Sequence, residues 1–335
     1  MIDLKTHYMG LTLKNPLVAS SSPLTESVEN LVRLEDAGIA AVVLPSLFEE
    51  QLTLESVTLD EDLWRGAQEF AEAVTYLPDL DNYNTNPDGY LELVRQAKRR
   101  LSVPVFASLN GSTPGGWIRY AREIEQAGAD GLELNIYAIE TDVHRSAEAV
   151  EDSYCDLVHK LKASVKLPIA VKMTPFFSSL PHIAKRFDRA GADALILFNR
   201  FYQPDFDIQN LEVIPRLTLS EPNELLLRLH WAAILFSRVR PDLAITGGVH
   251  SAEDVLKALM AGASVAMMAS VLLKNGSRYV HRVLDDLTRW MSENEYDAIR
   301  QMQGSMSHRS VPNPAAFERG NYMKVLSSYA LRLRQ

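Results

Sequence analysis

Four segments of the chain share one pattern of apolar and polar positions. In each, the apolar positions of a helical repeat lead to an Ala-Gly pair, and a run of mostly apolar residues follows. The four segments are Leu34–Ser46, Ile124–Asn135, Phe187–Asn199 and Ala258–Ser270. A glycine ends a helix in the left-handed conformation that a Cβ disfavours, and runs that are apolar on both faces are typical of parallel strands covered by helices. The pattern predicts a repeated helix–strand unit and an α/β fold.

Four more short apolar runs lie between these units, at Pro16–Ala19, Pro104–Ala107, Pro168–Val171 and Leu243–Ile245. Together, the predicted strands begin near residues 16, 41, 104, 131, 168, 194, 243 and 265. Helical patterns separate them, at Val28–Asp36, Trp117–Ala127, Ala149–Ala163, Leu180–Arg189, Asn223–Val239 and Ala252–Met260. Eight alternating units favour a closed (β/α)₈ TIM barrel over an open sheet.

Two stretches are too long for simple connections between these elements. Glu49–Leu101 follows the second predicted strand, contains Asp79, Asp81, Asn82, Asn84 and Asn86, and has an expected turn at Pro87–Gly89. We interpret it as an inserted loop region that covers the mouth of the barrel. Arg200–Pro222 follows the sixth strand. We predict a barrel over residues 1–292 and a C-terminal extension over residues 293–335, packed on or near it.

Composition and charge narrow the class of protein. The chain has 335 residues, of which 47% are hydrophobic and 23% charged, as in ordinary globular proteins. The net charge of −9 argues against binding to nucleic acid. No apolar run approaches the roughly 18 residues that span a bilayer, so we expect a cytoplasmic protein. The single cysteine, Cys155, excludes a disulfide framework and a multi-cysteine metal site; we interpret it as a half-buried helix residue and expect no metal.

Polar or small residues follow every predicted strand. They are Ser20, Ser21, Ser46, Ser108, Asn110, Asn135, Lys172, Asn199, Gly247, Gly248 and Ser270. Each alone suits an ordinary turn. Because barrels place their chemistry at the carboxyl ends of the strands, these residues are expected to converge on one mouth.

The strongest local signal lies in Ile245–Asp254, where a strand runs into Gly247-Gly248 and then into a helix start. Ser251 and Asp254 have nearly the spacing of a capping box. Paired glycines let the backbone approach an anion, and the loops after strands seven and eight of barrels commonly bind phosphate. With Ala269-Ser270 after the eighth strand, the sequence predicts a phosphate site; a plain turn with a helix cap is the alternative.

Lys172 ends the run that begins at Pro168, so its ammonium is expected in the mouth, where burial requires a negative partner. Three roles are open for this lysine. It could form a Schiff base in a lyase or aldolase, stabilise an anionic cofactor or intermediate, or make a surface salt bridge. Asn135 and Asn199 close two other strands. Their amides offer both donors and acceptors and suit the edge of a planar heterocycle, or a structural cap.

With these motifs, the chain resembles the dihydroorotate dehydrogenase family, in particular its soluble class 1 branch. The resemblance runs from Gly10 to about Gly276 and includes Gly10–Pro16 with Ala19–Ser21, Glu133–Asn135, Val171-Lys172, Asn199, Gly247-Gly248 and Ala269-Ser270. It implies an FMN-binding barrel that moves a hydride between a dihydropyrimidine-like small molecule and flavin N5. The implied FMN contacts are Ser20, Ser21, Ser46, Asn135, Lys172, Asn199, Gly247, Gly248, Ala269 and Ser270. Lys172 would stabilise the negative charge of reduced flavin. Homodimers and an electron-transfer partner subunit are implied as well.

The chain departs from the family on the substrate side. Leu44-Pro45-Ser46 replaces a motif that ends in Lys-Ser, Ala138 stands where the family has its catalytic cysteine base, Glu140 replaces an asparagine, and Leu217–Ser220 replaces a glycine-rich stretch. Without the base, dihydroorotate oxidation would lose roughly two to four orders of magnitude in rate. We therefore expect another substrate, with Lys172 as a catalytic residue and Tyr137, Glu140, Thr141, Asp142 and His144 as candidate replacement bases. The alternatives are the Lys172 Schiff-base enzyme and a flavin-binding electron relay without its own turnover.

Overall fold

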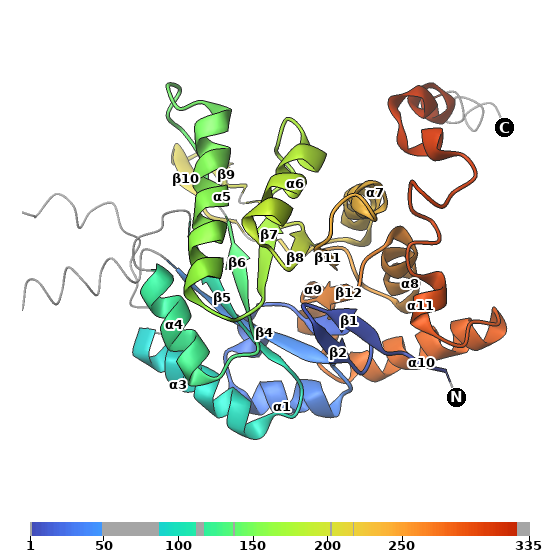
Figure 1. The fold of residues 1–335 in the computed structure, drawn as a ribbon, viewed down its shortest axis with the longest axis horizontal. Coiled ribbons are helices and arrows are strands. Elements are labelled where there is room, and N and C mark those ends of the chain that lie inside the picture. The colour runs from blue at the N-terminus through green and yellow to red at the C-terminus, as the bar shows by residue number, and fades with distance from the viewer. Residues whose placement is uncertain are drawn as a thin grey trace, which may run out of the picture.

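Eight parallel strands close into a barrel in the order β11-β12-β3-β4-β5-β6-β7-β8 (Figure 1). The computed structural model describes residues 2–48, 87–111, 117–136, 138–201, 203–216 and 218–326. The barrel strands are β3 (Leu17–Ala19), β4 (Ala41–Phe48), β5 (Val105–Asn110), β6 (Gly131–Asn135), β7 (Ile169–Met173), β8 (Ala194–Leu197), β11 (Asp242–Thr246) and β12 (Val265–Met268). All eight predicted strands are present, and the predicted (β/α)₈ class is confirmed.

Helices surround the barrel on its outer face (Figure 1). They are α1 (Val28–Asp36), α3 (Pro87–Arg100), α4 (Trp117–Ala127), α5 (Ala147–Ser164), α6 (Leu180–Ala190), α7 (Leu225–Leu235), α8 (Ala252–Ala261), α9 (Ser270–Asn275), α10 (Tyr279–Glu293) and α11 (Ile299–Met302). The predicted ends of α1 and α4 are correct. α7 is shorter than the predicted helix Asn223–Val239, because Phe236 leaves the helical conformation with a ψ of 129°.

The glycines of the four repeated segments end their helices as predicted. Gly38, Gly128, Gly191 and Gly262 have φ values of +103°, +95°, +102° and +117°. Each therefore turns the chain from a helix into the strand that follows.

The turn expected at Pro87–Gly89 is wrong, because these residues form the first turn of α3. Proline lacks the N–H that this turn would leave unpaired, and Asp88 is favourable near a helix N-terminus. Burial of Tyr90, Leu91 and Val94 along one face makes α3 a regular barrel helix. The rest of the predicted insertion, including Asp79, Asp81, Asn82, Asn84 and Asn86, lies outside the described residues.

The amino end of the barrel is closed by a hairpin of β1 (Thr6–Tyr8) and β2 (Leu11–Leu13). Tyr8, Met9 and Leu13 join the apolar cluster that fills the barrel interior. The Met9 N–H donates to Asp242 Oδ2 at 2.8 Å, which ties the hairpin to the start of β11. A second apolar cluster lies between the strands and the outer helices. The hairpin thus covers the amino end of the barrel interior with apolar side chains.

Two further regions complete the fold. The connection after β8 contains a hairpin of β9 (Asp205–Asp207) and β10 (Glu212–Ile214), followed by a short 3₁₀ turn, η4 (Pro222–Glu224). After α11 the chain runs beside α8, where the Gly304 N–H donates to Leu259 O at 2.9 Å. Two 3₁₀ turns follow, η5 (Pro314–Phe317) and η6 (Arg319–Asn321).

The structure bears on two expectations from the composition, one for Cys155 and one for membrane-spanning helices. Cys155 is half-buried in α5 as expected, and burial raises the pKa of its thiol to about 11. Within the described ranges, every helix is too short or too polar to cross a bilayer.

Replacing Gly262 with alanine is expected to lower the free energy of unfolding by about 3 kcal/mol. Its φ of +117° disfavours a Cβ, and the new methyl would lie 2.4 Å from the Phe236 ring. Gly128 is the matched control, since its φ is +95° and its added Cβ would meet only Lys98, at 3.9 Å. Gly128→Ala should lose about 1 kcal/mol. Urea unfolding measures both variants, and equal losses would contradict the packing argument at Phe236.

Candidate active site

A cavity of about 690 Å³ opens at the carboxyl ends of the barrel strands. Its lining includes all ten residues singled out for cofactor binding: Ser20, Ser21, Ser46, Asn135, Lys172, Asn199, Gly247, Gly248, Ala269 and Ser270. Asn110 lines it as well, whereas Ser108 is buried. The size lies within the range of cofactor and substrate sites.

The alternation of side chains along the strands places a polar layer on top of the apolar barrel interior. Phe106 and Ala170 point into the interior, so Ser108 and Lys172, two residues further along, face the same way. Glu133 lies opposite Ser108 in the register of β5 and β6. These strands therefore present a hydroxyl, a carboxylate and an ammonium at one level.

Lys172 has the negative partner that its burial requires. Its Nζ lies 3.1 Å from Glu133 Oε1, and both side chains are buried. The Ser108 hydroxyl also donates to this Oε1, at 3.4 Å, and its oxygen lies 2.8 Å from Ser46 Oγ. The surface salt bridge considered for Lys172 is therefore wrong. Glu133 was not predicted as the partner of Lys172, although a charged residue inside an apolar strand was a usable signal.

Asn135 contributes an unpaired acceptor to the cavity. Among the described residues, its Oδ1 is buried without a hydrogen-bond partner, as is Glu133 Oε2. An unpaired buried acceptor costs about 1–3 kcal/mol, which a ligand donor would recover. The Asn199 side chain lines the same cavity, and its backbone N–H donates to Met173 O at 2.7 Å.

The predicted phosphate end lies where β11 meets the start of α7. A Cβ on Gly248 would lie 2.4 Å from the Leu225 backbone nitrogen, so only glycine allows this approach. The Gly248 N–H donates to Ser220 Oγ at 3.3 Å, and the Ser220 hydroxyl donates to Ser270 Oγ at 2.9 Å. Beyond the glycines, Ser251 and Asp254 form the capping box at the start of α8.

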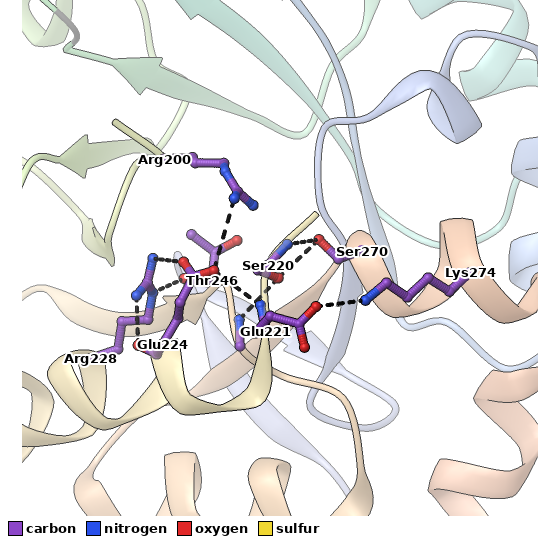
Figure 2. Close-up of polar contacts among 9 residues, drawn as sticks. Arg200, Ser220, Glu221, Glu224, Arg228, Thr246, Ser270 and Lys274 are labelled. Carbon is purple, nitrogen blue, oxygen red and sulfur yellow. Dashed lines mark hydrogen bonds and ion pairs between the residues drawn. The ribbon is translucent and has the colours of Figure 1, made fainter. Parts of the chain in front are cut away.

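Three charged residues at this end were missed by the sequence analysis. Figure 2 shows Arg200 and Arg228 approaching Glu224 from different sides. Arg228 is buried, and burial lowers the pKa of its guanidinium. The available signal was an arginine inside α7, whose other residues are mostly apolar.

The candidate replacement bases do not gather at the cavity. Tyr137 lies outside the described residues. Glu140 is on an exposed loop, where its Oε2 accepts from Arg145 at 2.6 Å, and it is not in the cavity lining. A hydrogen bond from the Asp142 N–H, together with Arg145, lowers the pKa of Glu140, which makes it a weaker proton acceptor. Thr141, Asp142 and His144 are likewise exposed and outside the lining.

Lys172→Met would leave the Glu133 carboxylate buried without its cation, and we expect a loss of about 3 kcal/mol in the free energy of unfolding. Adding Glu133→Gln removes the uncompensated charge and should recover more than half of that loss. Urea unfolding compares the variants. As a control, Lys98→Met breaks a partly exposed pair with Asp130 and should cost about 1 kcal/mol or less. A double variant no more stable than Lys172→Met would rule out this coupling.

Known proteins that this chain is similar to include dihydroorotate and dihydropyrimidine dehydrogenases. The family model described as dihydroorotate dehydrogenase matches residues 83–291. The catalytic subunit of dihydroorotate dehydrogenase B (NAD(+)) from Thermoplasma acidophilum is 26% identical over 314 residues, which cover 91% of this chain and 99% of the relative. The corresponding subunit from Methanocaldococcus jannaschii is 25% identical, with 87% and 94% covered. The NAD-dependent dihydropyrimidine dehydrogenase subunit PreA from Escherichia coli K12 is 24% identical, with 92% and 78% covered.

The matched segment contains most of the site described above. It runs from just before α3 into α10 and carries the Glu133–Lys172 pair, the two asparagines and the glycines that follow β11. The barrel fold, the site and the family match agree, and this chain belongs to the dihydroorotate dehydrogenase family.

Proposed function

We propose that this chain is an FMN-dependent oxidoreductase that moves a hydride between a carbon of a dihydropyrimidine-like substrate and the flavin ring. One observation carries the proposal: the buried Lys172 ammonium and the unpartnered Asn135 Oδ1 lie in one cavity, at the ends of neighbouring strands. A flavin ring offers an N–H donor beside carbonyl oxygens, and such a donor is what Asn135 lacks.

Different residues would hold the ring and the phosphate of this cofactor. Asn135 would accept a hydrogen bond from the ring, and Lys172 would provide a fixed positive charge beside it. Gly248, Ser220 and Ser270 would hold the phosphate. When bound, FMN supplies hydride transfer, and the protein supplies binding, orientation and electrostatics. Ser20, Ser21, Ser46, Asn199, Gly247 and Ala269 would form the remaining contacts.

The substrate side supports a molecule other than dihydroorotate. Ala138 is exposed and carries no proton acceptor where the family has its cysteine. Pro45 replaces a lysine, and the neighbouring Ser46 hydroxyl is engaged with Ser108. Glu140, one of the candidate replacement bases, is paired with Arg145 away from the cavity. Among the described residues, proton removal from dihydroorotate would therefore lack a dedicated base, and Lys172 remains the proposed catalytic side chain.

The ion pair of Lys172 disfavours the lyase alternative. A Schiff-base nucleophile must present a free amine, whereas Nζ is held as a charged donor 3.1 Å from Glu133 Oε1. The pair instead supports a lasting electrostatic role. All three compared relatives are named as subunits. They support the proposal that this chain also works with a partner, either a second copy or an electron-transfer subunit.

The purified protein is expected to be yellow, to show the visible bands of oxidised flavin, and to release FMN in about equimolar amount on denaturation. An absorption spectrum and chromatography of the released flavin test this. A colourless protein that does not take up added FMN would exclude the proposed function.

Dihydroorotate is expected to bleach the bound flavin under anaerobic conditions roughly two to four orders of magnitude more slowly than a normal enzymatic turnover of about 1–10³ s⁻¹. Ala138→Cys places a thiol where the family has its base; because Ala138 is exposed and outside the cavity lining, this variant should raise the rate at most about tenfold. Ala138→Ser, of similar size but a weaker base, is the control and should stay near the parent rate. A parent rate in the normal range would contradict the substrate proposal, and a panel of dihydropyrimidines identifies faster substrates.

A further inference from the structure

Arg228 is a buried cation, and no carboxylate of the described residues lies within hydrogen-bond distance of its guanidinium. Its Nε donates to Thr246 O and its Nη1 to Glu224 O, both at 2.6 Å. These bonds to backbone carbonyls orient the guanidinium but do not neutralise it. Nη2 is 3.7 Å from Glu224 Oε2, too far for a good hydrogen bond. A buried charge is costly unless an anion compensates it.

The position of this guanidinium is set by the strand end beside it. A Cβ on Gly247 would lie 2.8 Å from Arg228 Nη2. The glycine therefore lets Arg228 lie directly against the loop predicted to hold phosphate, and Arg228 lines the cavity together with Gly247, Gly248 and Ser270.

The charges around the cavity leave this end positive. Lys172 is matched by Glu133 and Arg216 by Asp205, at 3.1 and 2.5 Å. Among the described lining residues, Arg200 and Arg228 then share one carboxylate, since Arg200 Nη2 is 3.9 Å from Glu224 Oε1. The nearby Glu221 pairs with Lys274 at 3.2 Å and adds no net charge. Counted over the described lining residues and their partners, one positive charge therefore remains in excess at this end.

The donors around Gly248 are partly used within the protein. Ser220 accepts the Gly248 N–H and bonds to Ser270, a contact that Figure 2 shows. An anion at this point would have to compete for these donors. A charged side chain close by would attract an anion more strongly than neutral backbone N–H groups do.

We propose that Arg228 makes this cavity selective for a phosphorylated flavin over its unphosphorylated form, with Glu224 as the counter-ion that the phosphate replaces. The inference rests on the proposed function. A phosphate monoester carries about −1.5 to −2 charges near pH 7, which matches the excess positive charge better than a neutral ribityl chain does. Arg228 thereby acts on ligand choice and not on the hydride step.

Calorimetric titration of flavin-free protein with FMN and with riboflavin tests this selectivity. The parent should prefer FMN, and Arg228→Met should weaken FMN binding by roughly 10- to 100-fold while leaving riboflavin affinity unchanged. Glu224→Gln removes the competing carboxylate and should keep or raise the affinity for FMN. Arg216→Gln, which removes a paired charge from the same cavity, is the matched control and should leave the FMN-to-riboflavin ratio unchanged.

A merely structural arginine would change stability or both affinities together, so an unchanged affinity ratio in Arg228→Met would overturn the inference. If that variant does not fold, Arg228→Lys replaces it; this variant keeps a charge but loses the oriented fork, and its FMN preference should fall severalfold.

Inorganic phosphate separates this inference from the proposed function. At constant ionic strength, phosphate should raise the melting temperature of the parent above its value in chloride, and Arg228→Met should abolish that difference. Protection by phosphate without flavin binding would preserve the anion site and refute the flavin assignment. Equal binding of FMN and riboflavin, with no protection by phosphate, would refute the inference and leave the flavin assignment intact. No protection and no flavin binding would refute both.

Discussion

A closed ring of parallel strands gives polar side chains very little room. Both faces of each strand are covered, one by the barrel interior and one by helices, and a buried polar group is costly unless it is paired. The hairpin that carries Tyr8 and Met9 closes the amino end. The larger cavity opens at the carboxyl ends, where hydroxyls, amides and charges can meet water or a ligand, and the candidate site lies there.

Within that space, two cationic centres differ in how they are balanced. The Lys172 ammonium is matched by Glu133 beneath the cavity. At the other centre, Arg228 and Arg200 share Glu224 at distances too long for strong hydrogen bonds. Under the proposed function, the matched centre provides a fixed positive charge near a planar ring, whereas the unmatched centre attracts an anion. The two ends of the cavity are therefore suited to different parts of one ligand.

The sequence predicts most of this fold because its signals are local. Covered parallel strands appear as continuous apolar runs, and the Ala-Gly pairs mark the helix ends. The prediction of a turn at Pro87-Asp88-Gly89 is wrong because the same residues suit both a turn and the first turn of a helix. Burial of Tyr90 in the assembled protein decides between them.

The site is predicted less completely than the fold, for a related reason. Strand-end residues such as Asn135 and Lys172 follow from the topology. The partners Glu133 and Arg228 do not, because each depends on a contact with an element distant along the chain. Lys172 and Glu133 are 39 residues apart, and Arg228 and Thr246 are 18 apart. No local pattern shows which carboxylate or carbonyl such a side chain will face.

The pairing of β12 with β3, in which Ala266 lies opposite Leu17, joins strands from distant parts of the chain. As a ribosome extends the polypeptide, this seam stays open until the last barrel strand has emerged. Ser20 and Ser270, which flank the seam, cannot form one binding wall before then. Ligand capture in this architecture therefore requires that the last barrel strand has been made and the barrel has closed, and chains truncated before residue 265 would be unable to load.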